Sequence, residues 1–372
     1  MSAHSQRIER LRNLFGKSRV DGLLVSQPES RFYLSGYSGH DLPPRDSAGY
    51  LLIGKSESIL LTDRRTSEQA EHEAPDYEVI VYTPRARVST RIAQITRKLG
   101  IRRLGFESIH LPYAIWSAFN RAIKPRAELV PLKDPVDRLR ISKDEAELKS
   151  LQAAVDVLDD CFEHLVRNEI GVARTEREIA AEVERYLGRR GASTSFPSIV
   201  ASGPNASMPH AVPTDRRFQQ AEPITIDIGA RVDGYCSDMT RTVCIDRPSD
   251  KLREVHGLVL AAQEKAEREI ARGMTGKQAD AIARDFLKGA GYGKEFTHGL
   301  GHGIGLEVHE PPWVSLRGTQ ALEPGMVFSV EPGIYLPGWG GVRIEDLVVM
   351  EDERVRVLCR SCKSLELAEA AA

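Results

Sequence analysis

The sequence has no apolar run that approaches the roughly 20 residues needed to cross a bilayer. Its formal net charge is only −2, so it lacks the basic excess that draws proteins to nucleic acid or to anionic membranes. The first residues, 1–18, are polar and charged and do not contain the apolar core of a secretory signal. These absences predict a cytoplasmic protein with no membrane partner and no nucleic-acid partner.

Cysteine is also scarce, with five in 372 residues. An odd and sparse set is not typical of a disulfide framework. Cys359 and Cys362 form a single C-x-x-C, which could be a redox pair or half of a zinc site. Because no second pair and no histidine lie nearby in the sequence, we expect this motif to have neither role.

The chain is long enough for two domains, and its 41% hydrophobic and 28% charged residues are ordinary for a globular protein. Residues 1–133 alternate short strand-like stretches with helical ones, which predicts a small α/β domain. A polar segment at 134–141 is the expected linker, and residues 142–372 form the second domain. Strands are predicted at 22–26, 50–53, 58–61, 77–81, 103–106 and 128–130, and helices near 4–16, 86–99 and 111–122.

The second domain contains a weak internal repeat. A long helix of about 143–168 starts at a predicted capping box, Ser142–Glu145, and a shorter helix starts at another, Thr175–Glu178. A long helix of about 250–272 and a shorter one ending near Gly289 or Gly291 follow in the same order. This order predicts a duplicated α+β unit whose helices back a curved antiparallel sheet. An offset of 100 residues aligns Ala181, Leu187, Gly191 and Phe196 with Ala281, Leu287, Gly291 and Phe296.

Two acidic residues interrupt the apolar pattern of a predicted hairpin. Asp227 lies in the first strand, Asp233-Gly234 is a strong turn signal, and Asp238 lies at a similar distance beyond the turn. The Asp227 and Asp238 carboxylates could project from one face, where they would repel each other unless a cation lay between them. Asp233 is best explained as a turn residue.

A second predicted hairpin repeats this arrangement. Glu331 ends an apolar strand, a wide turn follows at 338–341, and Glu345 interrupts the returning strand. A single acidic residue in a strand usually faces the edge of the sheet. Four of them at hairpin-paired spacing favour a metal site instead.

The segment 298–310 is rich in glycine and contains three of the ten histidines. Its spacing is not that of a dinucleotide-binding loop, and Pro311 and Pro312 exclude the helix of an H-E-x-x-H zinc motif. The chain has no G-x-S-x-G nucleophile motif either. Four carboxylates with one imidazole suit a pair of divalent ions, best Mn²⁺, with Co²⁺, Zn²⁺ or iron also permitted.

At these residues the sequence resembles the pita-bread metallopeptidases, which include proline-specific aminopeptidases, prolidases and methionine aminopeptidases. The matching motifs are complete and in order over about 195–346. Residues 1–133 resemble the creatinase-like α/β domain of the proline-specific branch. The resemblance implies an α+β fold, in which this smaller domain precedes an internally duplicated pita-bread domain. It also implies five metal ligands, Asp227, Asp238, His302, Glu331 and Glu345.

The resemblance further implies that a metal-bridging water attacks the scissile carbonyl, with Glu331 as the general base. His309 and His210 would donate hydrogen bonds to the carbonyl or to the developing oxyanion. His298 and Arg317 would contact the substrate. On the residues alone, His210 and Arg317 could instead be plain loop residues, and His298 a hydrogen-bonded core histidine.

The expected substrate is a short peptide with proline in second place, or an Xaa-Pro dipeptide, and the family suggests a homodimer. Arg343, two residues before Glu345, could orient a ligand carboxylate or be a solvated strand arginine. Two other functions stay open, a hydrolase of another small amide or metabolite on the same fold and a non-catalytic binding protein. The second is disfavoured because four buried carboxylates without cations are costly.

Overall fold

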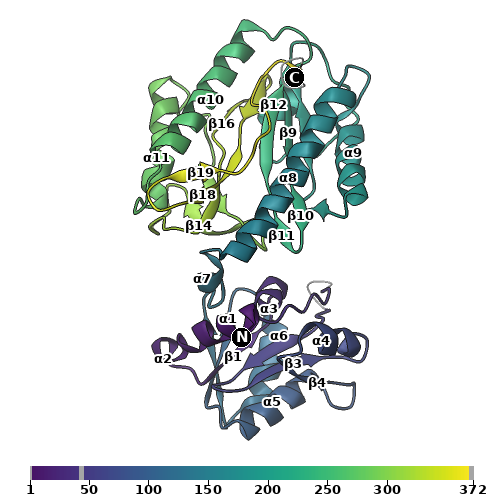
Figure 1. The fold of residues 1–372 in the computed structure, drawn as a ribbon, viewed down its shortest axis with the longest axis vertical. Coiled ribbons are helices and arrows are strands. Elements are labelled where there is room, and N and C mark those ends of the chain that lie inside the picture. Colours follow the sequence, from purple (N-terminus) through teal and green to yellow (C-terminus); the bar gives the residue numbers. More distant parts are fainter. Residues whose placement is uncertain (1, 42–45, 368–372) are drawn as a thin grey trace. The chain divides into compact units, whose positions relative to one another are not determined.

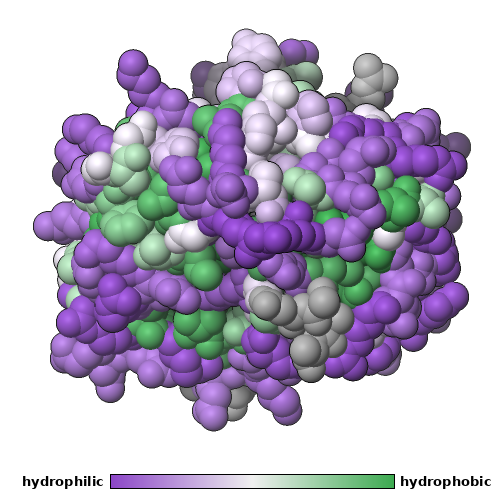
Figure 2. Space-filling model, turned by 90° about the horizontal axis from the view of Figure 1, so that it is seen from above, coloured by the Kyte–Doolittle hydropathy of each residue, from purple (hydrophilic) through white to green (hydrophobic). Residues whose placement is uncertain are grey.

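The computed structural model describes residues 2–41 and 46–367. They form two compact units, which divide between Arg140 and Ile141 (Figure 1). None of the helices in these described ranges is both long and apolar enough to cross a membrane. Hydrophilic residues dominate the face seen in Figure 2, with hydrophobic residues in patches between them. Each unit has its own core of buried apolar side chains.

The first unit is built on a six-stranded sheet with the order β4-β3-β2-β1-β5-β6. The β1–β2 and β2–β3 pairs are antiparallel, and the remaining pairs are parallel. All six predicted strands are confirmed, because each contains a short run of branched and apolar residues; the central strands are the most buried, and the edge strand β4 has no buried residue. They are β1 (Gly22–Val25), β2 (Tyr50–Ile53), β3 (Ser58–Thr62), β4 (Glu78–Val81), β5 (Arg103–Glu107) and β6 (Glu128–Leu132).

The helices of this unit differ more from prediction. The single helix expected at 4–16 is two, and α5 and α6 are confirmed within two residues at each end. Three helices, α3, α4 and α7, were not predicted, and α7 lies within the expected linker. The boundaries of α3 are ordinary, because it carries Pro28 in its first turn and is followed by Gly36 in the left-handed conformation. The helices are α1 (Ala3–Arg12), α2 (Phe15–Ser18), α3 (Pro28–Ser35), α4 (Ser67–Glu73), α5 (Val88–Lys98), α6 (Tyr113–Ile123) and α7 (Asp137–Arg140).

The second unit places its strands between two pairs of helices, as Figure 1 shows. The helices are α8 (Glu145–Asn168), α9 (Glu176–Arg189), α10 (Asp250–Glu269) and α11 (Gly276–Gly289). The strands of the first half are β7 (Ser193–Thr194), β8 (Ile199–Ser202), β9 (Ile224–Ile228), β10 (Ala230–Val232), β11 (Tyr235–Cys236) and β12 (Met239–Val243). Those of the second half are β13 (Gly301–Gly303), β14 (Glu310–Val314), β15 (Val327–Val330), β16 (Gly333–Leu336), β17 (Gly340–Arg343), β18 (Asp346–Met350) and β19 (Val355–Val357).

The start of α8 corrects one prediction. The N-cap is Asp144, whose side chain accepts from the Glu147 N–H, while the Glu147 side chain accepts from the Asp144 N–H. The capping box predicted at Ser142–Glu145 is therefore wrong. Ser142 instead donates its hydroxyl to the carbonyl of Pro324. Ser142 and Asp144 are each followed three residues later by a glutamate, so both fit a capping box. The hydroxyl of Ser142 is bound to Pro324 and is not available as the cap.

The internal repeat is visible in the shorter helices. Thr175 caps α9 and Thr275 caps α11, each within a complete capping box, so the box predicted at Thr175–Glu178 is confirmed. The two helices begin and end 100 residues apart, at the offset that the sequence indicated. The two halves therefore use the same helix start to build corresponding parts of the unit.

Candidate active site

The first acidic hairpin forms, but its pairing is divided between two sheets, β10–β11 next to the turn and β9–β12 beyond it. Strands β9 and β12 pair in antiparallel fashion with Asp227 opposite Thr240, and Asp238 immediately precedes β12. The turn residues Asp233 and Gly234 have φ of 50° and 85°, the left-handed backbone that a tight hairpin turn requires. Asp227 and Asp238 are only 8% and 5% exposed, so this hairpin buries both carboxylates.

The second acidic hairpin brings Glu331 and Glu345 to corresponding places. The β15–β18 ladder ends at the pair Val330 and Asp346, and the β16–β17 ladder begins at Gly333 and Arg343. Glu331 and Glu345 lie between these two ladders, one on each chain of the hairpin. The carboxylates of both hairpins line one cavity of about 500 Å³.

Eight of the nine residues predicted for the site line this cavity. Arg317 is the exception, because its side chain is exposed and it is not among the lining residues. Apolar side chains form much of the remaining wall, among them Phe196, Val212 and Trp313. The eight are Asp227, Asp238, His302, Glu331, Glu345, His210, His298 and His309.

His302 lies among the carboxylates. Its Nε2 is 3.3 Å from Glu331 Oε1 and 3.8 Å from Asp238 Oδ2. One potential ligand atom from each of Asp238, His302 and Glu345 lies within 4.8 Å of the other two. The His302 Nδ1 is 3.1 Å from the Gly303 carbonyl, so a proton held there leaves the Nε2 lone pair facing the carboxylates.

Three carboxylate oxygens show whether this group of residues fits a metal. Asp227 Oδ1, Asp238 Oδ1 and Glu345 Oε1 are buried and have no hydrogen-bond donor among the described residues. Other oxygens of the same groups are well partnered, since Glu345 Oε2 accepts from Thr240 Oγ1 at 2.7 Å. Buried acceptors without donors are costly, whereas oxygen-rich groups of this kind bind hard divalent cations. The residues fit a metal centre.

The electrostatics lead to the same conclusion. Burial, followed by repulsion from Glu345 and Asp227, raises the pKa of Asp238 well above its usual range. Burial and the neighbouring Glu331 raise the pKa of Glu345 in the same way. Burial also raises the pKa of Glu331. Cations between these groups would remove the conflict by favouring the charged forms.

Arg343 orients this group of carboxylates. Its Nη2 donates to Asp227 Oδ2 at 2.6 Å, its Nε to Thr240 Oγ1 at 3.0 Å and its Nη1 to the Tyr335 hydroxyl at 2.7 Å. Arg343 is 4% exposed, which excludes the interpretation as a solvated strand arginine. Sequence reasoning missed Thr240 and Tyr335. Thr240 lies within the Ser-Asp-Met-Thr-Arg run that carries Asp238, which was the available signal.

The three remaining histidines occupy different positions on the cavity. His298 Nε2 is 2.8 Å from the Tyr335 hydroxyl and its Nδ1 is 2.8 Å from the Gly299 carbonyl, so both ring nitrogens have partners. The His309 ring packs edge-on against the His302 ring with centroids 4.3 Å apart. Burial lowers the pKa of His309 to about 4, which keeps its ring neutral at pH 7. His210 is exposed on the cavity wall.

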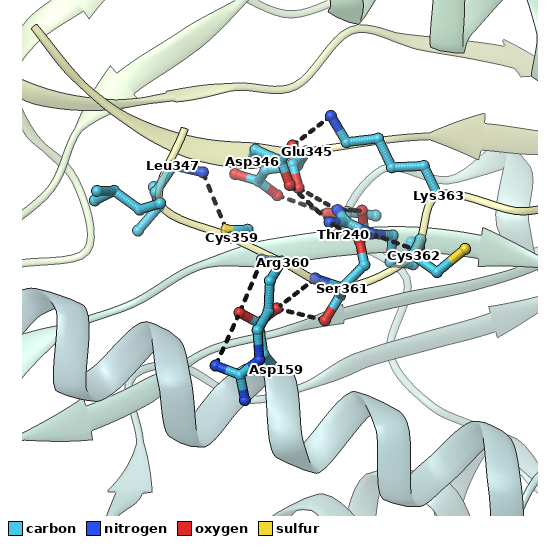
Figure 3. A network of polar contacts seen from close by, with 12 residues as sticks. Asp159, Thr240, Glu345, Asp346, Leu347, Cys359, Arg360, Ser361, Cys362 and Lys363 are labelled. Atoms are coloured by element: carbon cyan, nitrogen blue, oxygen red, sulfur yellow. Dashed lines mark hydrogen bonds and ion pairs between the residues drawn. The ribbon is translucent and has the colours of Figure 1, made fainter. Parts of the chain in front are cut away.

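A buried network lies behind Glu345. Arg241 Nη1 donates to the backbone carbonyls of Glu345 and Thr240 at 2.5 and 3.0 Å, and Arg241 Nη2 pairs with Asp346 at 2.7 Å. Figure 3 shows Lys363 reaching Asp346, an ion pair of 2.5 Å, and the segment that ends at Lys363 lying close to Glu345 and Asp346. This segment includes the C-x-x-C motif. Its Cys359 accepts a hydrogen bond from the Leu347 N–H, and both of its cysteines are free.

The two units match two known domains. Residues 149–352 match Metallopeptidase family M24, and residues 7–142 match the Creatinase/Prolidase N-terminal domain. Together they define a two-domain metallopeptidase with a creatinase-like N-terminal domain and a pita-bread C-terminal domain, the fold that the sequence predicted. The chain belongs to metallopeptidase family M24.

Relatives align over nearly the whole chain. An uncharacterized peptidase of Bacillus subtilis is 41% identical over 96% of this chain and 99% of its own length. The Xaa-Pro dipeptidase of Pyrococcus horikoshii is 34% identical over 98% of this chain and 100% of its own. Among solved structures, an Xaa-Pro dipeptidase from Bacillus anthracis has a TM-score of 0.92 at 40% identity, covering 98% of this chain and 99% of that one. An X-Pro aminopeptidase from Thermotoga maritima has a TM-score of 0.86 at 35% identity, covering 96% and 99%.

Proposed function

We propose that this chain is a dinuclear-metal peptidase that cleaves the Xaa-Pro bond at the N-terminus of short peptides or in Xaa-Pro dipeptides. The observation that carries the proposal is the convergence of four carboxylates and His302 on one cavity, where three buried carboxylate oxygens have no donor among the described residues. The substrate class is supported by relatives named as Xaa-Pro dipeptidases and an X-Pro aminopeptidase.

Asp227, Asp238, His302, Glu331 and Glu345 would hold the two ions, with Mn²⁺ the best match to this oxygen-rich set and Co²⁺ or Zn²⁺ as other possibilities. When bound, such a pair of ions supplies an acidic water as the nucleophile. The resemblance to the family also supports a homodimer in the cytoplasm. Light scattering on the purified chain tests the dimer.

Glu331 is the proposed general base. Its Oε1 accepts from Ser329 Oγ at 3.0 Å, which holds this oxygen in a fixed direction, and its Oε2 lies 4.0 Å from His298 Nδ1. Without metal, burial raises its pKa, and cations beside it would favour the charged form, which is the form that accepts a proton. Glu331 would take the proton of the attacking water and return it to the leaving amine.

His309 and His210 are proposed to hold the reacting carbonyl. The neutral His309 ring can donate one N–H to the oxygen as negative charge develops on it. His210 faces the same cavity from another part of the wall. His298, also on the wall, is proposed to contact the substrate with the edge of its ring.

Replacing Glu331 by Gln tests the proton-transfer role. The variant is expected to lose turnover by about 10²-fold or more, the range of general acid–base catalysis, while still binding metal through the remaining groups. Turnover and metal content are measured on the same preparation. Normal turnover with full metal content would rule out Glu331 as the base.

The substrate is tested by comparing Gly-Pro with Gly-Pro-Pro in the presence of Mn²⁺. Cleavage of the dipeptide alone identifies a dipeptidase, and cleavage of the tripeptide identifies an aminopeptidase. Arg317 lies two residues from Ser315, which lines the cavity. If Arg317 holds the carboxylate of a dipeptide, Arg317→Ala raises KM for Gly-Pro and leaves Gly-Pro-Pro unchanged. If neither peptide is cleaved, the proposed proline specificity is wrong.

A further inference from the structure

The wall that carries His210 is a loop with little structure of its own. Between β8 and β9, residues 203–213 contain only the short 3-10 turn η1 (Gly203–Ser207). Five consecutive residues of this loop, 209–213, line the cavity. A loop of this kind is mobile unless side chains or backbone groups fix its ends.

One buried carboxylate binds both ends of the loop. Glu176 Oε1 accepts from the N–H and the hydroxyl of Ser202 at 2.7 and 2.9 Å, just before the loop begins. Glu176 Oε2 accepts from the N–H and the hydroxyl of Thr214 at 3.0 and 2.6 Å, just after the loop ends. Asn205 Nδ2 lies 3.1 Å from both oxygens. The carboxylate therefore closes the loop through donors that are 12 residues apart in the sequence.

A side chain with two acceptor oxygens suits this place. Glu176 is 0% exposed, and every group around its two oxygens that is named above donates a hydrogen bond. Hydrogen bonds to a charged acceptor are about twice as strong as neutral ones. A glutamine has nearly the same shape, but its NH₂ group would face a backbone N–H donor at one of the two ends and would lose that hydrogen bond.

Starting α9 does not require Glu176. Thr175 and Glu178 form the capping box of α9, and Thr275 and Gln278 do the same for α11, where Gly276 occupies the position of Glu176. Both helix starts also hold a loop by backbone bonds, since the Glu176 N–H donates to Arg216 and the Gly276 N–H donates to Gln320. The Glu176 carboxylate is therefore present only at the start of α9, in the half of the domain that carries His210.

We infer that Glu176 is a positioning residue, which acts on the substrate through the loop it closes by keeping His210 in place. The loop has a further contact with the site, because the Pro209 carbonyl accepts a 3.4 Å hydrogen bond from Arg343 Nη1. This inference rests on the proposed function for its kinetic consequences only. The closure of the loop by Glu176 can be measured without any substrate.

The variant Glu176→Gln tests this role, with Glu178→Ala as the matched control. Glu178→Ala removes the capping box from the same helix turn without touching the loop. We expect hydrogen exchange of residues 203–213 to become faster in Glu176→Gln only. We expect kcat/KM for the Xaa-Pro substrate to fall about 10- to 100-fold in Glu176→Gln, the scale of a misplaced group, and less than about 2-fold in the control.

A double variant separates positioning from general destabilisation. If Glu176 acts through His210, adding Glu176→Gln to His210→Ala lowers kcat/KM by less than about 3-fold further, because coupled residues are not additive. An equal loss in both backgrounds, or unchanged exchange of the loop, would overturn the inference. Another outcome is that the wild type cleaves no Xaa-Pro peptide while hydrogen exchange of the loop is faster in Glu176→Gln. In that case the proposed function is wrong, and the closure of the loop by Glu176 is still supported.

Discussion

Arg343 Nη2 and Asp227 Oδ2 form an ion pair of 2.6 Å, and their side chains are 4% and 11% exposed. This contact occupies one oxygen of the carboxylate. The other, Oδ1, has no donor among the residues that the structure describes. Arg343 therefore fixes the direction in which Asp227 offers its free oxygen.

Replacing Arg343 by Lys should disturb this geometry while keeping the charge. Arg343 contacts Asp227, Thr240 and Tyr335 through three different nitrogens. Lysine has a single nitrogen and cannot occupy all three positions. We expect a decrease of about 10- to 100-fold in metal affinity or in kcat/KM, as for other outer partners of metal ligands. Metal titration and steady-state kinetics measure these quantities.

The control for Arg343 is Arg356→Lys, which changes an exposed arginine of β19 that pairs with Glu351. It should leave metal affinity and kinetics unchanged. If Arg343→Lys behaves like this control, the orienting role of Arg343 is wrong.

Metal removal should reverse the effect of one substitution on stability. Without metal, burial and repulsion favour the neutral form of Asp238, which asparagine imitates. Asp238→Asn should therefore melt at a higher temperature than the wild type in EDTA. With Mn²⁺ at 100 times its Kd the wild type gains about 2.7 kcal/mol, and the variant, which lacks a ligand, should gain less. Thermal melting of both proteins in both conditions tests this, and a shift of the same sign in both would contradict it.

Gly276→Ala should be destabilising because the added methyl group would overlap the Trp313 carbonyl oxygen. Overpacking of this kind costs about 1–3 kcal/mol, and moving Trp313 should also raise KM because Trp313 lines the cavity. Gly289, at the other end of α11, has no described atom within 4 Å of the same added group. Gly289→Ala should leave stability unchanged or raise it by up to about 1 kcal/mol. Urea unfolding and kinetics compare the two, and equal effects would refute the steric argument.

His256 should make stability depend on pH. It lies in α10 at 6% exposure, and burial lowers its pKa to about 4. As the pH falls below 6.5, His256 binds a proton in the unfolded chain, whereas in the folded chain it stays neutral until about pH 4. The folded state should lose about 3 kcal/mol across this window, since one pKa unit corresponds to about 1.4 kcal/mol.

His256→Gln should lack this contribution, so the difference between variant and wild type should grow as the pH falls. Urea unfolding is followed by tryptophan fluorescence in a Trp116→Phe background. The remaining tryptophans, Trp313 and Trp339, then report on residues 141–372 alone. A constant difference from pH 7 to pH 4 would show that His256 is not responsible.

The sequence was sufficient for the parts of the site that depend on local pattern. The alternation of β9 and the Asp233-Gly234 turn determine the pairing of the hairpin, so the positions of Asp227 and Asp238 could be predicted. The 100-residue spacing of α9 and α11 was visible for a similar reason, because capping residues lie next to the helices they start.

The rest depends on contacts between distant segments. Tyr335 reaches His298 across 37 residues, and Glu176 reaches Thr214 across 38. Nothing in the residues next to Glu176 separates it from a solvated glutamate in the first turn of a helix. Similarly, Ser142 and Asp144 carry equal capping signals, and the contacts of Ser142 with Pro324 and of Lys143 with Gly325 hold these two residues outside α8.

The pairing of Glu176 with Gly276 has a consequence for how the cavity can change during evolution. The wall with His210 is fixed in part by the Glu176 side chain, and most substitutions at 176 would remove its hydrogen bonds to both ends of the loop. The wall with Trp313 depends on the absence of a side chain at 276, because any larger residue there would have to displace the Trp313 carbonyl. The two halves therefore have different mutational routes to a new substrate size. Only at residue 276 can side chains of gradually increasing size shift a cavity wall in small steps.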